Sequence, residues 1–93
     1  MIKSFRHKGL EEFYTNGSRA GIQTHHADKL RIQLTALDAA ASADDLRAPA
    51  AWRLHPLSGK LKDFYSLTVN GNWRVIFRFD ANDVELVDYL DYH

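Results

Sequence analysis

The stretch Tyr65-Ser-Leu-Thr-Val-Asn-Gly-Asn-Trp-Arg-Val-Ile-Phe-Arg-Phe79 contains two runs of alternating residues around a central Asn70-Gly71 dipeptide. Alternation with a period of two is typical of strands that bury one face. Asn-Gly between two such runs is a strong hairpin signal, because both central residues of a tight turn must accept positive φ. We therefore predict a hairpin that turns at Asn70-Gly71. Its aromatic side chains should face the core, and Arg74 and Arg78 should share the opposite face.

A further strand is expected after this hairpin. Asp80-Ala-Asn-Asp83 is a turn sequence, and residues 84–91 follow it with several apolar positions. Hairpin connections place consecutive strands side by side, so this last strand should lie beside the strand that carries Arg74. At the start of the chain, residues 2–5 are compatible with a short first strand.

Helical spacing is found between these strands. Residues 8–14 should form a brief helix that stops at Asn16-Gly17, and a longer helix should run from about residue 24 to residue 41. Ser42-Ala-Asp-Asp45 is the pattern of a capping box and predicts one more helical turn before Pro49. The apolar residues of the long helix recur at steps of three and four and should pack on the sheet: Ala27, Leu30, Leu34, Leu37 and Ala41.

Together these elements predict an α+β domain, with two to three N-terminal helices packed on one face of a mainly antiparallel β-sheet. A length of 93 residues fits a single domain over residues 1–93. Trp52 and Trp73 are interpreted as core anchors. The chain has no cysteine, which excludes disulfides and thiolate metal sites. We recognise neither a secretion signal nor an apolar run long enough to span a membrane, so we expect a cytoplasmic protein without a membrane partner.

The charges are balanced overall but unevenly distributed. Twelve basic and twelve acidic residues give a net charge of zero. Residues 47–78 hold six bases and one acid, whereas residues 80–91 hold five acids and no base. The basic stretch is suited to facing a polyanion. The alternative is that facing strands exchange opposite charges across a ladder.

The open face of such a sheet should gather His55, Arg74, Arg78 and the residues at the end of the sequence. Two imidazoles and a guanidinium suit metal-free cleavage of RNA. One imidazole takes the proton of a 2′-hydroxyl, the second protonates the departing 5′-oxygen, and the guanidinium stabilises the charge on the phosphate. Imidazole fits the first two tasks because its pKa lies near neutrality.

His93 is expected to be the proton donor, and His55 the base. The terminal α-carboxylate and Asp91 should both favour the protonated form of His93. Tyr92, next to this site, is suited to stacking on a base. The adjacent His25-His26 pair is interpreted as a solvated helix terminus rather than a zinc site, because a third ligand at close spacing is missing from the sequence.

Several separated motifs, in this order and spacing, resemble the HigB toxins of the RelE superfamily, also described as plasmid-maintenance killer proteins. The motifs are Met1-Ile-Lys-Ser-Phe5 with Lys8-Gly-Leu10, Leu54-His-Pro-Leu-Ser-Gly59, Asn72-Trp-Arg-Val-Ile-Phe77 and Asp88-Tyr-Leu-Asp-Tyr-His93. The resemblance implies a RelE-like fold and the toxin of a type II toxin–antitoxin pair. Such a toxin is a small endoribonuclease that enters the ribosomal A site and cuts the messenger there, without a cofactor. Near-zero net charge fits this dependence on the ribosome.

The resemblance also implies partners and site residues. A HigA-type helix-turn-helix antitoxin should neutralise the toxin, and operator DNA should be reached only through the antitoxin complex. The residues implied in cleavage are His55, Arg74, Asp91, Tyr92 and His93. Some relatives place a lysine where this chain has Ser58. Lys60 or Lys62 is expected to make that phosphate contact instead, with Arg78 as a further RNA-binding residue.

Two other functions are compatible with the same fold. ParE-like proteins poison DNA gyrase without hydrolysing anything, and fold does not decide function. A terminal histidine favours the nuclease, since a gyrase binder needs no acid–base pair. A degenerate toxin that serves as the antitoxin's corepressor is the third interpretation, and Ser58 is the feature that suggests it.

Overall fold

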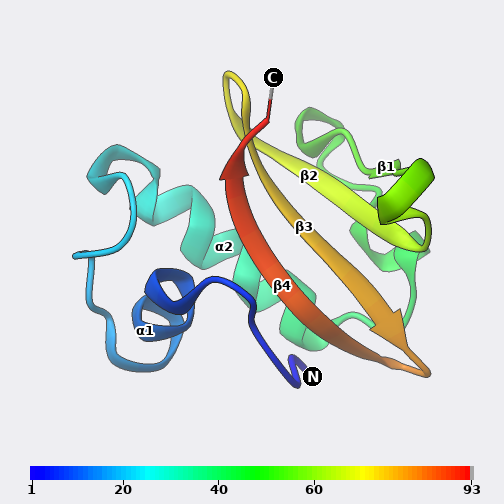
Figure 1. The fold of residues 1–93 in the computed structure, drawn as a ribbon, viewed down its shortest axis with the longest axis horizontal. Helices are drawn as coiled ribbons and strands as arrows, with labels where there is room; N and C mark the ends of the chain where they lie inside the picture. Colours follow the sequence, from blue (N-terminus) through cyan, green and yellow to red (C-terminus); the bar gives the residue numbers. More distant parts are fainter. Residues whose placement is uncertain (93) are drawn as a thin grey trace.

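The computed structural model describes residues 1–92, which form two α-helices and a four-stranded antiparallel sheet (Figure 1). The helices are α1 (Lys8–Asn16) and α2 (Ala27–Ala39). One 3₁₀ turn, Thr24–His26, directly precedes α2, and others follow it. The strands lie in the order β1 (His55–Pro56), β2 (Phe64–Asn70), β3 (Trp73–Asp80) and β4 (Asp83–Asp91). This confirms the α+β class and the position of the last strand beside the third.

Local sequence signals explain where each helix begins and ends. His7 Nδ1 accepts the N–H of Leu10 at the start of α1, and Gly17 ends the helix with a φ of 78°. The long helix ends at Ala39, two residues earlier than predicted. The capping box is the reason, because the Asp45 carboxylate accepts the N–H groups of Ala41 and Ser42 and so competes with helix continuation.

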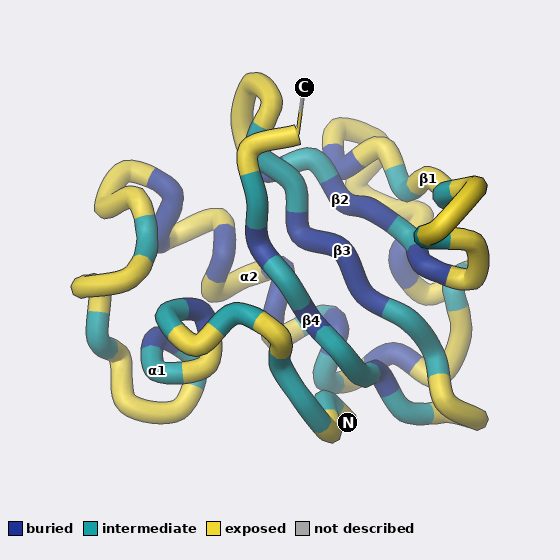
Figure 2. Tube along the Cα trace, viewed as in Figure 1, coloured by how far each residue is buried: buried dark blue, intermediate teal, exposed yellow. Residues whose placement is uncertain are grey.

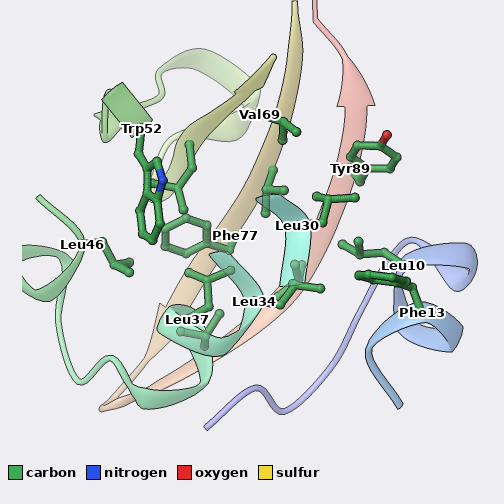
Figure 3. Packing of buried hydrophobic residues seen from close by; sticks show 14 of the residues in the cluster. Leu10, Phe13, Leu30, Leu34, Leu37, Leu46, Trp52, Val69, Phe77 and Tyr89 are labelled. Carbon is green, nitrogen blue, oxygen red and sulfur yellow. The ribbon is translucent and has the colours of Figure 1, made fainter. Parts of the chain in front are cut away.

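The core lies between α2 and the sheet, and α1 closes one end of it (Figure 3). Leu30, Leu34 and Leu37 of α2 pack in the same cluster as Phe77 of β3, and none of the four has exposed area. An isolated helix of 13 residues is marginal in water. Burying each leucine contributes about 1.5–3 kcal/mol, so tertiary packing stabilises α2. Trp52 belongs to this core, as predicted.

The hairpin between β2 and β3 is confirmed, but its turn differs from the prediction. Gly71 has a φ of 57°, whereas Asn70 is still the last residue of β2 and pairs with Trp73. The ladder is irregular between Thr68 and Asn70. That irregularity moves the turn one residue along the chain, so Asn70 does not need positive φ.

The N-terminal segment, residues 2–5, runs beside β4 without forming a regular strand. Ile2 and Phe5 make isolated parallel bridges to Val84 and Val87. Between them, Ser4 Oγ accepts the N–H of Leu86, which has a φ of 56° at an irregularity in the ladder. This segment therefore covers the free edge of β4 and fixes a strained position in it.

Acidic residues on both sides of the β3–β4 turn form ion pairs with the protein's own bases. Lys3 Nζ lies 2.8 Å from Asp80 Oδ2, and Arg78 Nε donates to Glu85 Oε2 at 2.8 Å. Arg78 and Glu85 are direct partners in the β3–β4 register. The expected pairing of opposite charges between neighbouring strands is confirmed for Arg78 and Glu85. Within residues 1–92, neither α-helix has the length and apolar character needed to cross a bilayer.

Candidate active site

The short strand β1 places His55 at the edge of the sheet. A 3₁₀ turn, Ala50–Trp52, precedes it and is anchored by the buried Trp52. Arg53 ends that turn in the left-handed conformation, with φ 50° and ψ 54°, and its N–H donates to Ala50 O. The chain then pairs with β2, where His55 lies opposite Ser66. His55 is thus held by backbone bonds while its side chain stays exposed.

Arg74 lies on the same face, two strands away. It pairs with Thr68 of β2, and Thr68 and Ser66 are two residues apart, so both point to one side of the sheet. Arg74 Nη1 donates to the carbonyl oxygens of Gly71 at 2.7 Å and Trp73 at 3.0 Å. These two bonds fix the plane of the half-buried guanidinium against the hairpin turn.

Tyr92 follows the end of β4 and extends the ladder by one bond. Its N–H donates to Asn72 O at 2.8 Å, and its side chain is 46% exposed. Asp91 pairs with Trp73 in the β3–β4 register and is exposed. His93, the expected proton donor, lies outside the described residues.

A cavity of about 480 Å³ lies where these elements meet. This size is within the range of about 300–1,000 Å³ that small-molecule sites occupy. Figure 2 shows the exposed segment before β2 and the exposed chain end on either side of the buried strands β2 and β3. The cavity is lined by residues of segment 53–58, two residues of β2, one of β3 and the residue after β4: Arg53, Leu54, His55, Leu57, Ser58, Ser66, Thr68, Arg74 and Tyr92.

The charged side chains that line the cavity within residues 1–92 are all basic. It contains two guanidiniums, Arg53 and Arg74, and no carboxylate among the described residues. An anion can therefore enter without displacing an internal partner. His55 and the hydroxyls of Ser58, Ser66 and Thr68 add hydrogen-bonding groups.

Three of the predicted site residues line this cavity together: His55, Arg74 and Tyr92. Arg78 lies elsewhere, in a second hollow with Asp63, Asp80 and Glu85. Lys60 and Lys62 are exposed, and neither lines the cavity. The RNA-binding role expected for these three bases remains a prediction.

Several lining residues were not singled out from the sequence. Arg53 was counted only within the basic stretch, although it stands two residues before His55. Ser66 and Thr68 form the polar half of the β2 alternation, and this is the signal from which their place on the open face could have been predicted. The register of β2 against both neighbours was needed to show that they lie between His55 and Arg74.

A buried aromatic group supports the site from the core side of the sheet. The ring of Trp73, next to Arg74, stacks on Tyr89 at 4.7 Å between centroids. His26 Nδ1 lies 2.7 Å from the Tyr89 hydroxyl, and His26 is only 2% exposed. The prediction of a solvated His25-His26 pair is therefore wrong for His26, because Tyr89 and Trp73 cover its ring. Burial lowers the pKa of His26, and the neighbouring charges of His25 and Lys29 lower it further.

The described residues contain no group of three histidine, aspartate or glutamate side chains arranged to hold a metal ion. The chemical groups gathered in the cavity are instead an imidazole, guanidiniums, hydroxyls and a phenol. This set can bind a phosphodiester and move protons near neutral pH.

Residues 3–93 match a protein family described as the RelE-like toxin of type II toxin–antitoxin system HigB. The Endoribonuclease HigB of Proteus vulgaris is 38% identical over 93 residues, which cover 100% of both chains. Toxin HigB-1 of Vibrio cholerae serotype O1 is also 38% identical, over 94 residues that cover 100% of this chain and 98% of that protein. These relatives therefore match along the whole length of the chain.

Among solved structures, the YoeB–YefM complex from Staphylococcus aureus contains a chain of similar fold. The TM-score is 0.64, with 17% sequence identity, and the match covers 100% of this chain and 95% of that one. At this identity the likeness concerns the fold alone. It agrees with the RelE-like fold that the sequence motifs imply.

Proposed function

Because the chain belongs to the HigB family of RelE-like toxins of type II toxin–antitoxin systems, we propose that it is an endoribonuclease that cuts messenger RNA in the ribosomal A site. One observation carries this proposal. His55, Arg74 and Tyr92 come from three separate parts of the chain and line one cavity that, among the described residues, has no acidic group. This is the chemistry needed to hold a phosphodiester next to a proton acceptor.

The proposed reaction needs no metal. His55 takes the proton of the 2′-hydroxyl, whose oxygen attacks the adjacent phosphorus, and the bond from phosphorus to the 5′-oxygen breaks. The products carry a 2′,3′-cyclic phosphate and a 5′-hydroxyl. His93 gives its proton to the 5′-oxygen, and Asp91 favours the protonated form of that imidazole.

Arg74 stabilises the extra negative charge on the phosphate. Its guanidinium is oriented in advance by the Gly71 and Trp73 carbonyls, so little reorganisation is required when the charge develops. Tyr92 is exposed, lines the cavity and stacks on a base of the messenger. Lys60 and Lys62, both exposed, contact RNA outside the cavity. Arg78 is proposed to do so only through Nη1, because its Nε and Nη2 are hydrogen-bonded to Glu85.

The proposed partners follow from the family. A toxin of a type II pair is neutralised by an antitoxin, and we propose a HigA-type helix-turn-helix protein that links this chain to operator DNA. The toxin acts in the cytoplasm, where the ribosome presents its substrate. The chain's zero net charge supports a dependence on the ribosome, because free RNA is attracted only weakly.

The decisive experiment maps messenger 5′ ends after brief induction of the wild type, His93→Ala and His55→Ala. We expect cuts in phase with codons that carry 5′-hydroxyls, and their loss in both variants. His25→Ala is the matched control, since His25 is exposed and does not line the cavity. Growth arrest with DNA gyrase damage and without messenger cuts would instead indicate a ParE-like poison. Repression by the antitoxin complex without growth arrest would indicate a corepressor.

A further inference from the structure

Arg53 has an unusual combination of charge and surroundings. It is exposed, it lines the cavity, and its guanidinium has no hydrogen-bond or ion-pair partner within residues 1–92. Other arginines are occupied: Arg47 pairs with Asp44, and Arg78 pairs with Glu85. A cation left unpaired beside a cavity that lacks acidic groups, as far as the described chain shows, is available to a ligand with negative charge.

The backbone of Arg53 is also held in a conformation that suits another residue better. A φ of 50° and a ψ of 54° lie in the left-handed region, which glycine adopts without steric conflict and arginine does not. The position ends a 3₁₀ turn, where glycine or asparagine is common. A long cationic side chain brings no benefit to this turn. A strained residue that lines a cavity indicates that its side chain has a functional role there, such as binding a ligand.

The neighbouring bases do not replace it. Lys60 and Lys62 do not line the cavity, and position 58, on the same wall, is a serine. Arg53 and Arg74 are therefore the two cationic groups of the lining among the described residues. Arg74 already uses Nη1 on two backbone carbonyls, whereas the whole planar fork of Arg53 is available for phosphate oxygens.

We propose that Arg53 is a second substrate-binding cation, which holds a phosphate of the RNA backbone next to the scissile phosphate held by Arg74. This inference rests on the proposed function and adds a residue to its site. Arg53 acts in binding and in orienting the strand, and Arg74 acts on the charge that develops during cleavage. Loss of Arg53 should therefore weaken substrate binding and leave the chemical step almost unchanged.

The test compares Arg53→Asn with Arg53→Lys and with the control Arg19→Asn. Asparagine tolerates the left-handed conformation, so it removes the charge without adding strain. Arg19 is exposed and, within residues 1–92, also has no ion-pair partner, but it lies outside the cavity. Single-turnover cleavage of messenger on programmed ribosomes gives the half-saturating toxin concentration and the maximal rate.

For Arg53→Asn we expect the half-saturating concentration to rise about tenfold, with the maximal rate within about twofold of wild type. Arg53→Lys should recover most of the binding, and Arg19→Asn should behave as wild type. Unchanged saturation in Arg53→Asn overturns the inference. A fall in maximal rate without a change in saturation also overturns it, because the residue would then act on the chemical step.

Two further measurements separate the inference from folding and from the proposed function. For an uncleavable 2′-O-methyl RNA oligonucleotide, the logarithm of the binding constant falls linearly with the logarithm of the salt concentration. The magnitude of this slope should be smaller by about 0.7 in Arg53→Asn, because one phosphate contact is lost. This readout remains valid even if the wild type fails to cut messenger, which would overturn the proposed function instead. Arg53→Gly should unfold about 4 °C above the wild type and still bind RNA weakly. A lower unfolding temperature would indicate a structural role and refute the inference.

Discussion

The orientation of Arg74 leads to the most informative prediction, which concerns Arg74→Lys. Lysine keeps the positive charge, but its ammonium is a point charge that cannot hold two phosphate oxygens in a plane. If the ammonium donates to Gly71 O and Trp73 O, as Nη1 does at 2.7 Å and 3.0 Å, only one of its three N–H groups is left for the phosphate. The substitution therefore separates the effect of the positive charge from the effect of a fixed orientation of the N–H donors.

The expected magnitudes follow from these contacts. The two backbone bonds are at or near the surface, so their loss should reduce the free energy of unfolding by only about 1 kcal/mol. Removal of an oriented donor from a developing negative charge typically lowers the rate by about 10²–10³. We expect Arg74→Gln to show that full loss. Arg74→Lys should lose about 10–100-fold, because it keeps the charge without the geometry.

Single-turnover cleavage on programmed ribosomes measures the rate, and urea unfolding measures the stability. Arg47→Lys is the matched control, since Arg47 is an exposed arginine that does not line the cavity. A wild-type cleavage rate in Arg74→Lys would contradict this prediction, because the fixed orientation of the guanidinium would then contribute nothing to the rate. The prediction also fails if the variant loses several kcal/mol of stability, because the rate effect would then reflect a damaged hairpin.

Three further substitutions test the fold that holds the site. His26 has a lowered pKa, so stability present above pH 6.5 should decrease as the pH falls below that value, and His26→Gln should lose this part of the pH dependence in urea unfolding. Gly21→Ala would place a Cβ 2.5 Å from Gly9 Cα and should destabilise the chain by about 1–3 kcal/mol; an unchanged melting temperature would contradict this close approach. Ala81 has a φ of 54°, so Ala81→Gly should raise stability by about 0.5–1 kcal/mol without affecting cleavage, and a loss of stability by calorimetry would refute the strain.

The sequence predicted those elements whose signals are local. Gly17 ends α1, the Ser42 capping box forms, and the β2–β3 hairpin lies where the alternation placed it. The end of α2 was predicted too late, because the helical pattern continues through Ala41 while the Asp45 carboxylate binds that residue's N–H. Whether a side chain or a helical carbonyl accepts a backbone N–H depends on the three-dimensional geometry, which the spacing of apolar residues does not reveal.

The site was predictable as a set of chemical groups but not as a cavity. His55, Arg74 and Tyr92 could be chosen by residue type, and the expected strand order brought them to one face. Arg53 could not be chosen in this way, since its place in the cavity depends on a left-handed backbone after a 3₁₀ turn. The same limit applies to His26, because adjacent histidines at a helix start give no sign that one of them packs under Tyr89.

The zero net charge of the chain conceals a separation of charge between the two ends of the sheet. Near the β3–β4 turn, Lys3 pairs with Asp80 and Arg78 pairs with Glu85, so two of the acids around this turn are paired within the fold. At the other end, the cavity lining contains two arginines and, among the described residues, no acid. Long-range attraction to free RNA depends on the total charge and is weak, whereas attraction within a cavity depends on the local charge. A protein arranged in this way binds RNA in bulk solution only weakly and acts efficiently on a strand that another structure has delivered, which is what dependence on the ribosome requires.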